Sequence, residues 1–125
     1  MNESGFSWRA RARSFRYAFD GIKSLIIGEH NARIHCVAAL CVVLAGLWLG
    51  LERWEWVAVA LCIGGVLMAE GFNSAVEALA DKTCGTPDPL IKRAKDIAAG
   101  AVLLFVMAAV AVGLLVFVPK MCSFL

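Results

Sequence analysis

Residues 56–81 read WVAVALCIGGVLMAEGFNSAVEALAD, an apolar run that continues into a polar one without a turn signal. In the polar half, Glu70, Asn73, Glu77 and Asp81 are spaced i, i+3, i+7 and i+11, so a helix places them on one face. The fourteen residues before Glu70 give a helix of about 21 Å, whereas the hydrocarbon core is about 30 Å thick. We therefore expect a membrane-spanning helix that carries Glu70 and Asn73 to the membrane edge and Glu77 and Asp81 beyond it.

The composition of the whole chain also predicts a membrane protein. The chain has 125 residues and is 61% hydrophobic, whereas soluble domains are about 45–50% apolar. A chain this short has too little interior to bury the excess, so we expect a single membrane domain over residues 1–125. Arginine and lysine are concentrated before residue 34 and in 82–95, which predicts a cytoplasmic N-terminus and a cytoplasmic 82–95 loop.

The remaining patterns predict an all-α membrane protein with an N-terminal amphipathic surface helix and three transmembrane helices. Apolar residues in the first helix recur at gaps of four and three opposite cations, which is typical of a helix on an anionic membrane surface. The same pattern also fits a helix packed on protein. We expect no nucleic-acid partner for these arginines beside membrane segments. Pro119 should end the last helix, and LERWEW (51–56) should form a tight exterior loop. The surface helix and the spans are expected at about 6–27, 33–51, 55–80 and 90–118.

All of these segments are expected to bring polar side chains to the same level of the membrane. The residues are Glu29, Glu70, Asn73, Glu77, Lys95 and Asp96. Oxygen ligands suit Mg²⁺, which proteins hold with one or two carboxylates together with substrate phosphates. With a lysine for phosphate and a spare carboxylate as base, this set is typical of phosphoryl transfer.

Three points about this polar set remain open from the residues alone. A non-enzymatic membrane scaffold or a cation conduit would also need intramembrane acids, although 56–69 and 97–118 carry no charged residue that could extend a polar path. Glu29 and Arg33 could form only a local i, i+4 ion pair. His35 lies at the membrane edge, where a histidine is more often a hydrogen-bonded group than a ligand.

Two motifs resemble those of a known family. Glu70-Gly-Phe-Asn73-Ser-Ala-Val-Glu77, followed by Asp81, resembles the E-x-x-N-[ST]-A-[IV]-E-x-x-x-D signature of the bacterial diacylglycerol kinase and undecaprenol kinase family. The stretch RAKDIAAGAV at 93–102 resembles the same family, and the match covers nearly all of the chain. The resemblance implies an ATP- and Mg²⁺-dependent lipid kinase of the bacterial inner membrane. It also implies a homotrimer whose active sites are cytoplasmic and shared between subunits.

The resemblance also implies roles for individual residues. Glu70 matches the proposed base that takes the proton of the lipid hydroxyl, and Asn73 and Lys95 match polar residues of the catalytic site. Glu29 and Glu77 match the carboxylates that hold Mg²⁺ bridged to ATP. Nucleotide contacts are further expected at Tyr17, Thr86, Pro87, Asp88, Lys95 and Asp96. At Asp88 the sequence departs from the family, which often has histidine there.

The substrate is indicated by a second, shorter resemblance. Residues 29–35, EHNARIH, are similar to the E-x-N-x-R-I-H string common in undecaprenol kinases. Ala99 lies where diacylglycerol kinases often carry serine. Both features favour undecaprenol over diacylglycerol, and each lipid offers a primary hydroxyl at the same depth.

Overall fold

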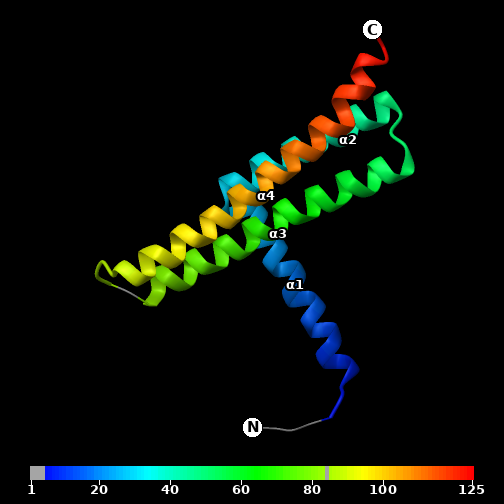
Figure 1. The fold of residues 1–125 in the computed structure, drawn as a ribbon. Helices are drawn as coiled ribbons and strands as arrows, with labels where there is room; N and C mark the ends of the chain where they lie inside the picture. Colours follow the sequence, from blue (N-terminus) through cyan, green and yellow to red (C-terminus); the bar gives the residue numbers. More distant parts are fainter. Residues whose placement is uncertain (1–4, 84) are drawn as a thin grey trace.

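The structure is a computed structural model that describes residues 5–83 and 85–125, and these residues form four helices. The helices are α1 (Trp8–Gly28), α2 (His30–Leu49), α3 (Arg53–Thr83) and α4 (Pro89–Cys122). α3 packs against both α2 and α4 in an elongated bundle, and α1 leaves this bundle at an angle (Figure 1). Helices α2, α3 and α4 are each long and apolar enough to cross a membrane. The predicted all-α fold is therefore confirmed, with three helices that could span a membrane.

A single extended residue separates α1 from α2. Glu29 has φ −117° and ψ 118°, so it ends one helix and caps the next. At its other end α1 is capped by Ser7, whose hydroxyl accepts a hydrogen bond from the Ala10 amide. α1 has no buried residue, and the aromatic rings of Trp8 and Phe15 are exposed. That this helix lies on the membrane surface stays a prediction.

The turn between α2 and α3 is shorter than predicted. Gly50 has φ +74°, in the left-handed region that favours glycine, and its amide donates to the Gly46 carbonyl. α3 begins at Arg53, so most of the expected LERWEW loop is helical. A side-chain cap supports the early start, because the Glu55 carboxylate accepts the Glu52 amide at 2.8 Å.

The buried core cluster of the bundle lies near this turn, which we call the turn end of the bundle. Buried Leu51, Val59 and Val116 form the core cluster there. Further along, the Phe105 ring of α4 occupies the space that a Cβ at Gly65 of α3 would take. The absence of a side chain at this glycine therefore lets α3 and α4 approach closely.

The prediction that Pro119 ends the last helix is wrong, since α4 continues to Cys122. Proline removes one helical N–H bond, but only about one further turn follows it. The Lys120 ammonium of this turn lies 3.1 Å from the buried Glu55 carboxylate and donates to the Gly50 carbonyl. These contacts fix the end of α4 to the turn end of the bundle.

Candidate active site

The polar face of α3 becomes more exposed toward the end of the bundle opposite the turn. Glu70 is only 5% exposed, Asn73 and Glu77 are half-buried, and Asp81 is exposed. The sequence predicted this order from the spacing of the four residues along one helix. Of the three carboxylates on this face, the innermost is therefore the one best shielded from water.

Glu70 is paired with a histidine from α2. Its Oε1 lies 3.1 Å from His35 Nε2, across the interface between the two helices. The expectation that His35 is a hydrogen-bonded group is confirmed. The sequence did not predict that its partner would be the proposed catalytic base.

Glu29 also reaches α3. The hydroxyl of Ser74 donates to Glu29 Oε1 at 2.9 Å, which brings the break between α1 and α2 beside the helix turn that carries Asn73. Arg33, considered as a local partner of Glu29, instead donates to the Ile27 carbonyl at 2.7 Å. The chain break thus places a carboxylate next to the predicted catalytic face.

The oxygen atoms around this position fit a magnesium ion. Asn73 Oδ1 is buried and, among the described residues, has no hydrogen-bond partner. A buried acceptor of this kind costs about 1–3 kcal/mol when unsatisfied, so a cation or a donor from a ligand would stabilise it. Glu29 and Glu77 supply carboxylates from the two neighbouring segments.

The described residues contain no group of three or more His, Cys, Asp or Glu side chains suited to a metal ion. A protein-only cage is therefore not formed within the described part of a single chain. Mg²⁺ is usually held by one or two carboxylates plus substrate phosphates and water, so Glu29, Glu77 and the free Asn73 oxygen match its preference.

A polar recess of about 780 Å³ lies where α3 leads into α4. It is lined by five of the residues predicted to contact the nucleotide, together with Asp81 and Lys92. The five are Thr86, Pro87, Asp88, Lys95 and Asp96. In the recess Lys95 pairs with Asp81 at 3.2 Å, and Lys92 pairs with Asp96 at 2.7 Å. Exposed ion pairs contribute only about 0–1 kcal/mol to the free energy of unfolding. Phosphate groups could therefore replace the carboxylates as partners of the two lysines at little cost.

Two of the predicted nucleotide residues have other positions or contacts. Asp88 is the N-cap of α4, and its Oδ1 accepts the Leu90 amide at 2.8 Å. Tyr17 lies on α1, is 66% exposed and does not line the recess. Within one chain the structure therefore gives Asp88 a structural contact and leaves Tyr17 apart from the other site residues.

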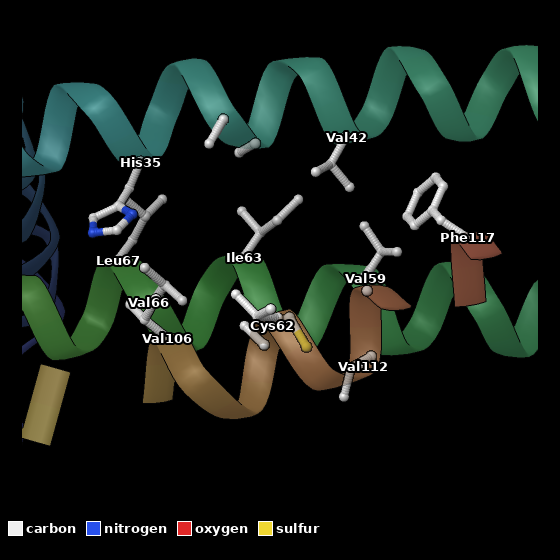
Figure 2. Close-up of a pocket in the computed structure, with 15 residues that line it drawn as sticks. His35, Val42, Val59, Cys62, Ile63, Val66, Leu67, Val106, Val112 and Phe117 are labelled. Carbon is white, nitrogen blue, oxygen red and sulfur yellow. The ribbon is translucent and has the colours of Figure 1, made fainter. Parts of the chain in front are cut away.

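An apolar groove of about 280 Å³ runs between α2, α3 and α4 from the Glu70–His35 pair toward the turn end. Figure 2 shows His35 at one end of this groove and Val59 and Phe117 toward the other. Apart from His35, its lining side chains are apolar or cysteine. A cation path would need polar groups along this length, so the groove gives no support to the conduit hypothesis.

Sequence reasoning missed two residues of the site, His35 as the partner of Glu70 and Ser74 as the partner of Glu29. Both had a signal. His35 is the only histidine in the first apolar run, and Ser74 lies inside the motif that carries Asn73. The sequence did not indicate how α2 is rotated about its axis, or toward which residue of α3 the Glu29 side chain points.

Comparison with known proteins shows the family of this chain. The sequence model of the family described as prokaryotic diacylglycerol kinase matches residues 16–117. An undecaprenol kinase from Bacillus subtilis (strain 168) is 38% identical over 109 residues, which cover 87% of this chain and 89% of that protein. A diacylglycerol kinase from Synechocystis sp. is 40% identical over 111 residues, covering 88% of this chain and 63% of that protein. A diacylglycerol kinase from Escherichia coli (strain K12) is 31% identical over 109 residues, covering 87% of this chain and 88% of that protein.

Proposed function

The chain belongs to the prokaryotic diacylglycerol kinase family and is a lipid kinase, and from this premise we propose that it transfers the γ-phosphate of ATP to the primary hydroxyl of a membrane lipid. The observation that carries the proposal is the position of the buried Glu70 carboxylate. The apolar groove extends from its partner His35 toward the turn end, and the polar recess lies further along α3 in the opposite direction. A lipid alcohol can approach from the first side and a nucleotide from the second.

The length of α3 supports the placement of Glu70 at the boundary between the hydrocarbon and the cytoplasm. Its 31 residues extend over about 46 Å, so they exceed the hydrocarbon core of about 30 Å. With Arg53 at the far interface, α3 leaves the hydrocarbon about 20 residues later, near Phe72. Glu70 then lies about 3 Å inside the boundary and Glu77 about 7 Å outside it. A lipid headgroup hydroxyl is confined to the same boundary.

In the proposed reaction Glu70 accepts the proton of the lipid hydroxyl as the hydroxyl oxygen attacks the γ-phosphorus. The new phosphorus–oxygen bond forms while the bond to the bridging oxygen of ADP breaks, and ADP leaves with that electron pair. Lys95 lines the recess and is paired with Asp81. Once the nucleotide phosphates replace Asp81 as its partner, Lys95 offers them a positive charge. Asn73, with its unpaired oxygen beside the acids, orients groups in the same site.

We propose Mg²⁺ as the metal, with Glu29 and Glu77 as its protein ligands. Bound there with the nucleotide, it would neutralise charge on the transferring phosphate. Glu29 is already held against α3 by Ser74. Glu77 is on α3, one helix turn from Asp81 of the recess, or about 6 Å along the axis. The two carboxylates therefore flank the route from the recess to Glu70.

We propose undecaprenol as the preferred acceptor over diacylglycerol. The support is the EHNARIH string at 29–35, together with Ala99 where diacylglycerol kinases often carry serine. Relatives named for each lipid match this chain over most of its length. A direct comparison of the two lipids is therefore the decisive measurement.

We further propose a homotrimer in the bacterial inner membrane, with the N-terminus and the active site on the cytoplasmic side. Within one chain, only 17%, 17% and 11% of the residues in the most apolar 18-residue stretch of each candidate span are buried. Large apolar faces therefore remain for lipid and for neighbouring subunits. Tyr17 is exposed on a helix that leaves its own bundle. An assembly in which sites are shared would give Tyr17 a recess on another subunit.

The proposal is tested with purified protein in detergent micelles and ATP labelled at the γ-phosphate. Undecaprenol and diacylglycerol are supplied in parallel reactions, each with a matched reaction containing EDTA. We expect label in the lipid extract, a higher rate with undecaprenol, and loss of labelling with EDTA. No label in either lipid would overturn the kinase proposal, and faster labelling of diacylglycerol would overturn the choice of acceptor.

A further inference from the structure

We propose that His35 is a positioning residue for the proposed reaction, because its imidazole fixes one oxygen of the Glu70 carboxylate and leaves the other oxygen for the lipid hydroxyl. The inference rests on the proposed function, in which Glu70 is the base. The residues assigned so far lie on α1, α3 and α4, at Glu29 between α1 and α2, and in the loop before α4. His35 adds a residue from α2.

The direction of the hydrogen bond follows from the chemistry of the two groups. An ionised carboxylate can only accept, so the imidazole donates its Nε2–H to Glu70 Oε1 over 3.1 Å. One carboxylate oxygen is thereby held by α2. Oε2 is left as the oxygen that can receive a proton from substrate.

His35 has no evident substitute in this role. Within residues 5–83 and 85–125 it is the only hydrogen-bond partner found for the Glu70 side chain. The Glu70 side chain is 7% exposed and that of His35 is 24% exposed. A carboxylate this deeply buried is strongly destabilising without a partner, so the imidazole both retains the charge at this position and restricts its rotation.

The surroundings of His35 place it between the carboxylate and the hydrocarbon. It is the one side chain with a strongly polar group among those that line the apolar groove, and Figure 2 shows its ring at the groove's end near Leu67. A lipid whose chain lies along this groove would therefore place its hydroxyl at the groove's end, beside His35 and Glu70. This position suits a group that orients the base at the point where substrate arrives.

A second buried pair in the same bundle provides a matched control. At the turn end, Lys120 lies 3.1 Å from Glu55, and their side chains are 22% and 5% exposed. Distance and burial thus match the His35–Glu70 pair closely. Glu55 is 15 residues before Glu70 on α3, or about 22 Å along the helix. Breaking this pair perturbs the fold without touching the site.

The test compares four variants by their rate of lipid phosphorylation per folded protein, with folding measured separately by thermal unfolding in detergent. His35→Leu removes the donor. His35→Gln restores it, because the glutamine Nε2 is as many bonds from Cα as the histidine Nε2. His35→Asn carries an amide that is one methylene too short to reach Oε1. Lys120→Met is the control.

We expect kcat to fall about 10- to 100-fold in His35→Leu and His35→Asn, as for the loss of one hydrogen bond to a charged group. His35→Gln should stay within about fivefold of wild type, a smaller loss than that of the charged hydrogen bond. Lys120→Met should lose stability but keep its kcat per folded protein. The KM for ATP should not change in the His35 variants, since the recess lies elsewhere.

The inference is overturned if His35→Leu keeps the wild-type kcat, or if His35→Gln is as slow as His35→Asn. Should His35→Leu fail to fold, the comparison of the Gln and Asn variants decides the question by itself. A wild-type chain that phosphorylates no lipid overturns the proposed function and this inference with it. An active wild type with insensitive His35 variants overturns only the role of His35.

Discussion

Replacing Glu70 by glutamine is the most direct test of the proposed chemistry. Glutamine has nearly the same shape as glutamate, and its Oε1 can still accept the Nε2–H of His35 that now reaches Glu70 Oε1 at 3.1 Å. The substitution therefore keeps the contact between α2 and α3. It removes only the ability of residue 70 to take a proton at the second oxygen.

The expected magnitudes for activity and for stability differ widely. A general base contributes about 10²- to 10⁴-fold to a rate, so kcat should fall by that factor, which corresponds to about 2.7–5.4 kcal/mol of activation free energy. The hydrogen bond from His35 loses its charge assistance, at a cost of about 1 kcal/mol. Loss of a buried charge at a side chain that is 5% exposed offsets part of that cost. The free energy of unfolding should thus change by no more than about 1 kcal/mol.

The assay measures transfer of labelled γ-phosphate to lipid in micelles, with saturating Mg-ATP and lipid, and the unfolding of the same preparation. Glu70→Gln with a wild-type kcat would refute the assignment of Glu70 as base. A large loss of stability would refute the reasoning about the retained contact. In the Glu70→Gln background, His35→Leu should have little further effect on kcat, since the two residues act on the same proton transfer.

Three further predictions follow from the same geometry. Glu77→Gln should raise the Mg²⁺ concentration for half-maximal rate by at least about tenfold, because even outer-shell changes cost that much; an unaltered metal titration argues against ligation. Lys95→Met should raise the KM for ATP about tenfold or more without loss of stability, since its present ion pair is exposed; an unchanged KM refutes the phosphate contact. Gly65→Ala should lower stability by about 1–2 kcal/mol through overlap with Phe105, whereas Gly64→Ala, with open space around it, should be neutral or stabilising; equal effects of the two refute the packing argument.

The number and order of the helices could be predicted because three apolar runs have the length of a membrane span. The exact ends could not, because local contacts decide them. α3 begins at Arg53 owing to the cap between Glu52 and Glu55. α4 passes Pro119, where one lost hydrogen bond lies close to the helix end and Lys120 is held by partners from the turn.

The order of exposure along α3 could also be predicted, since spacing and length determine which acid lies deepest. The partners of these acids could not. α2 is apolar on nearly all sides, so its sequence gives no hydrophobic face from which to infer its rotation. Whether His35 points toward α3 or toward lipid is therefore a property of packing. In the proposed homotrimer, the expected contacts of Tyr17 come from another subunit.

The two buried carboxylates of α3 show how one helix can hold a structural acid and a reactive acid. Glu55 Oε1 accepts the Glu52 amide and also lies beside the ammonium of Lys120, so the charge of this carboxylate is compensated. Glu70 has a histidine partner instead, and a neutral imidazole can donate one hydrogen bond without cancelling the negative charge. The acid at the turn end can therefore hold the helices together, whereas the acid beside the groove has no lysine or arginine partner to compensate its charge. This difference in partner, more than the burial that the two acids share, is why we assign the chemistry to Glu70.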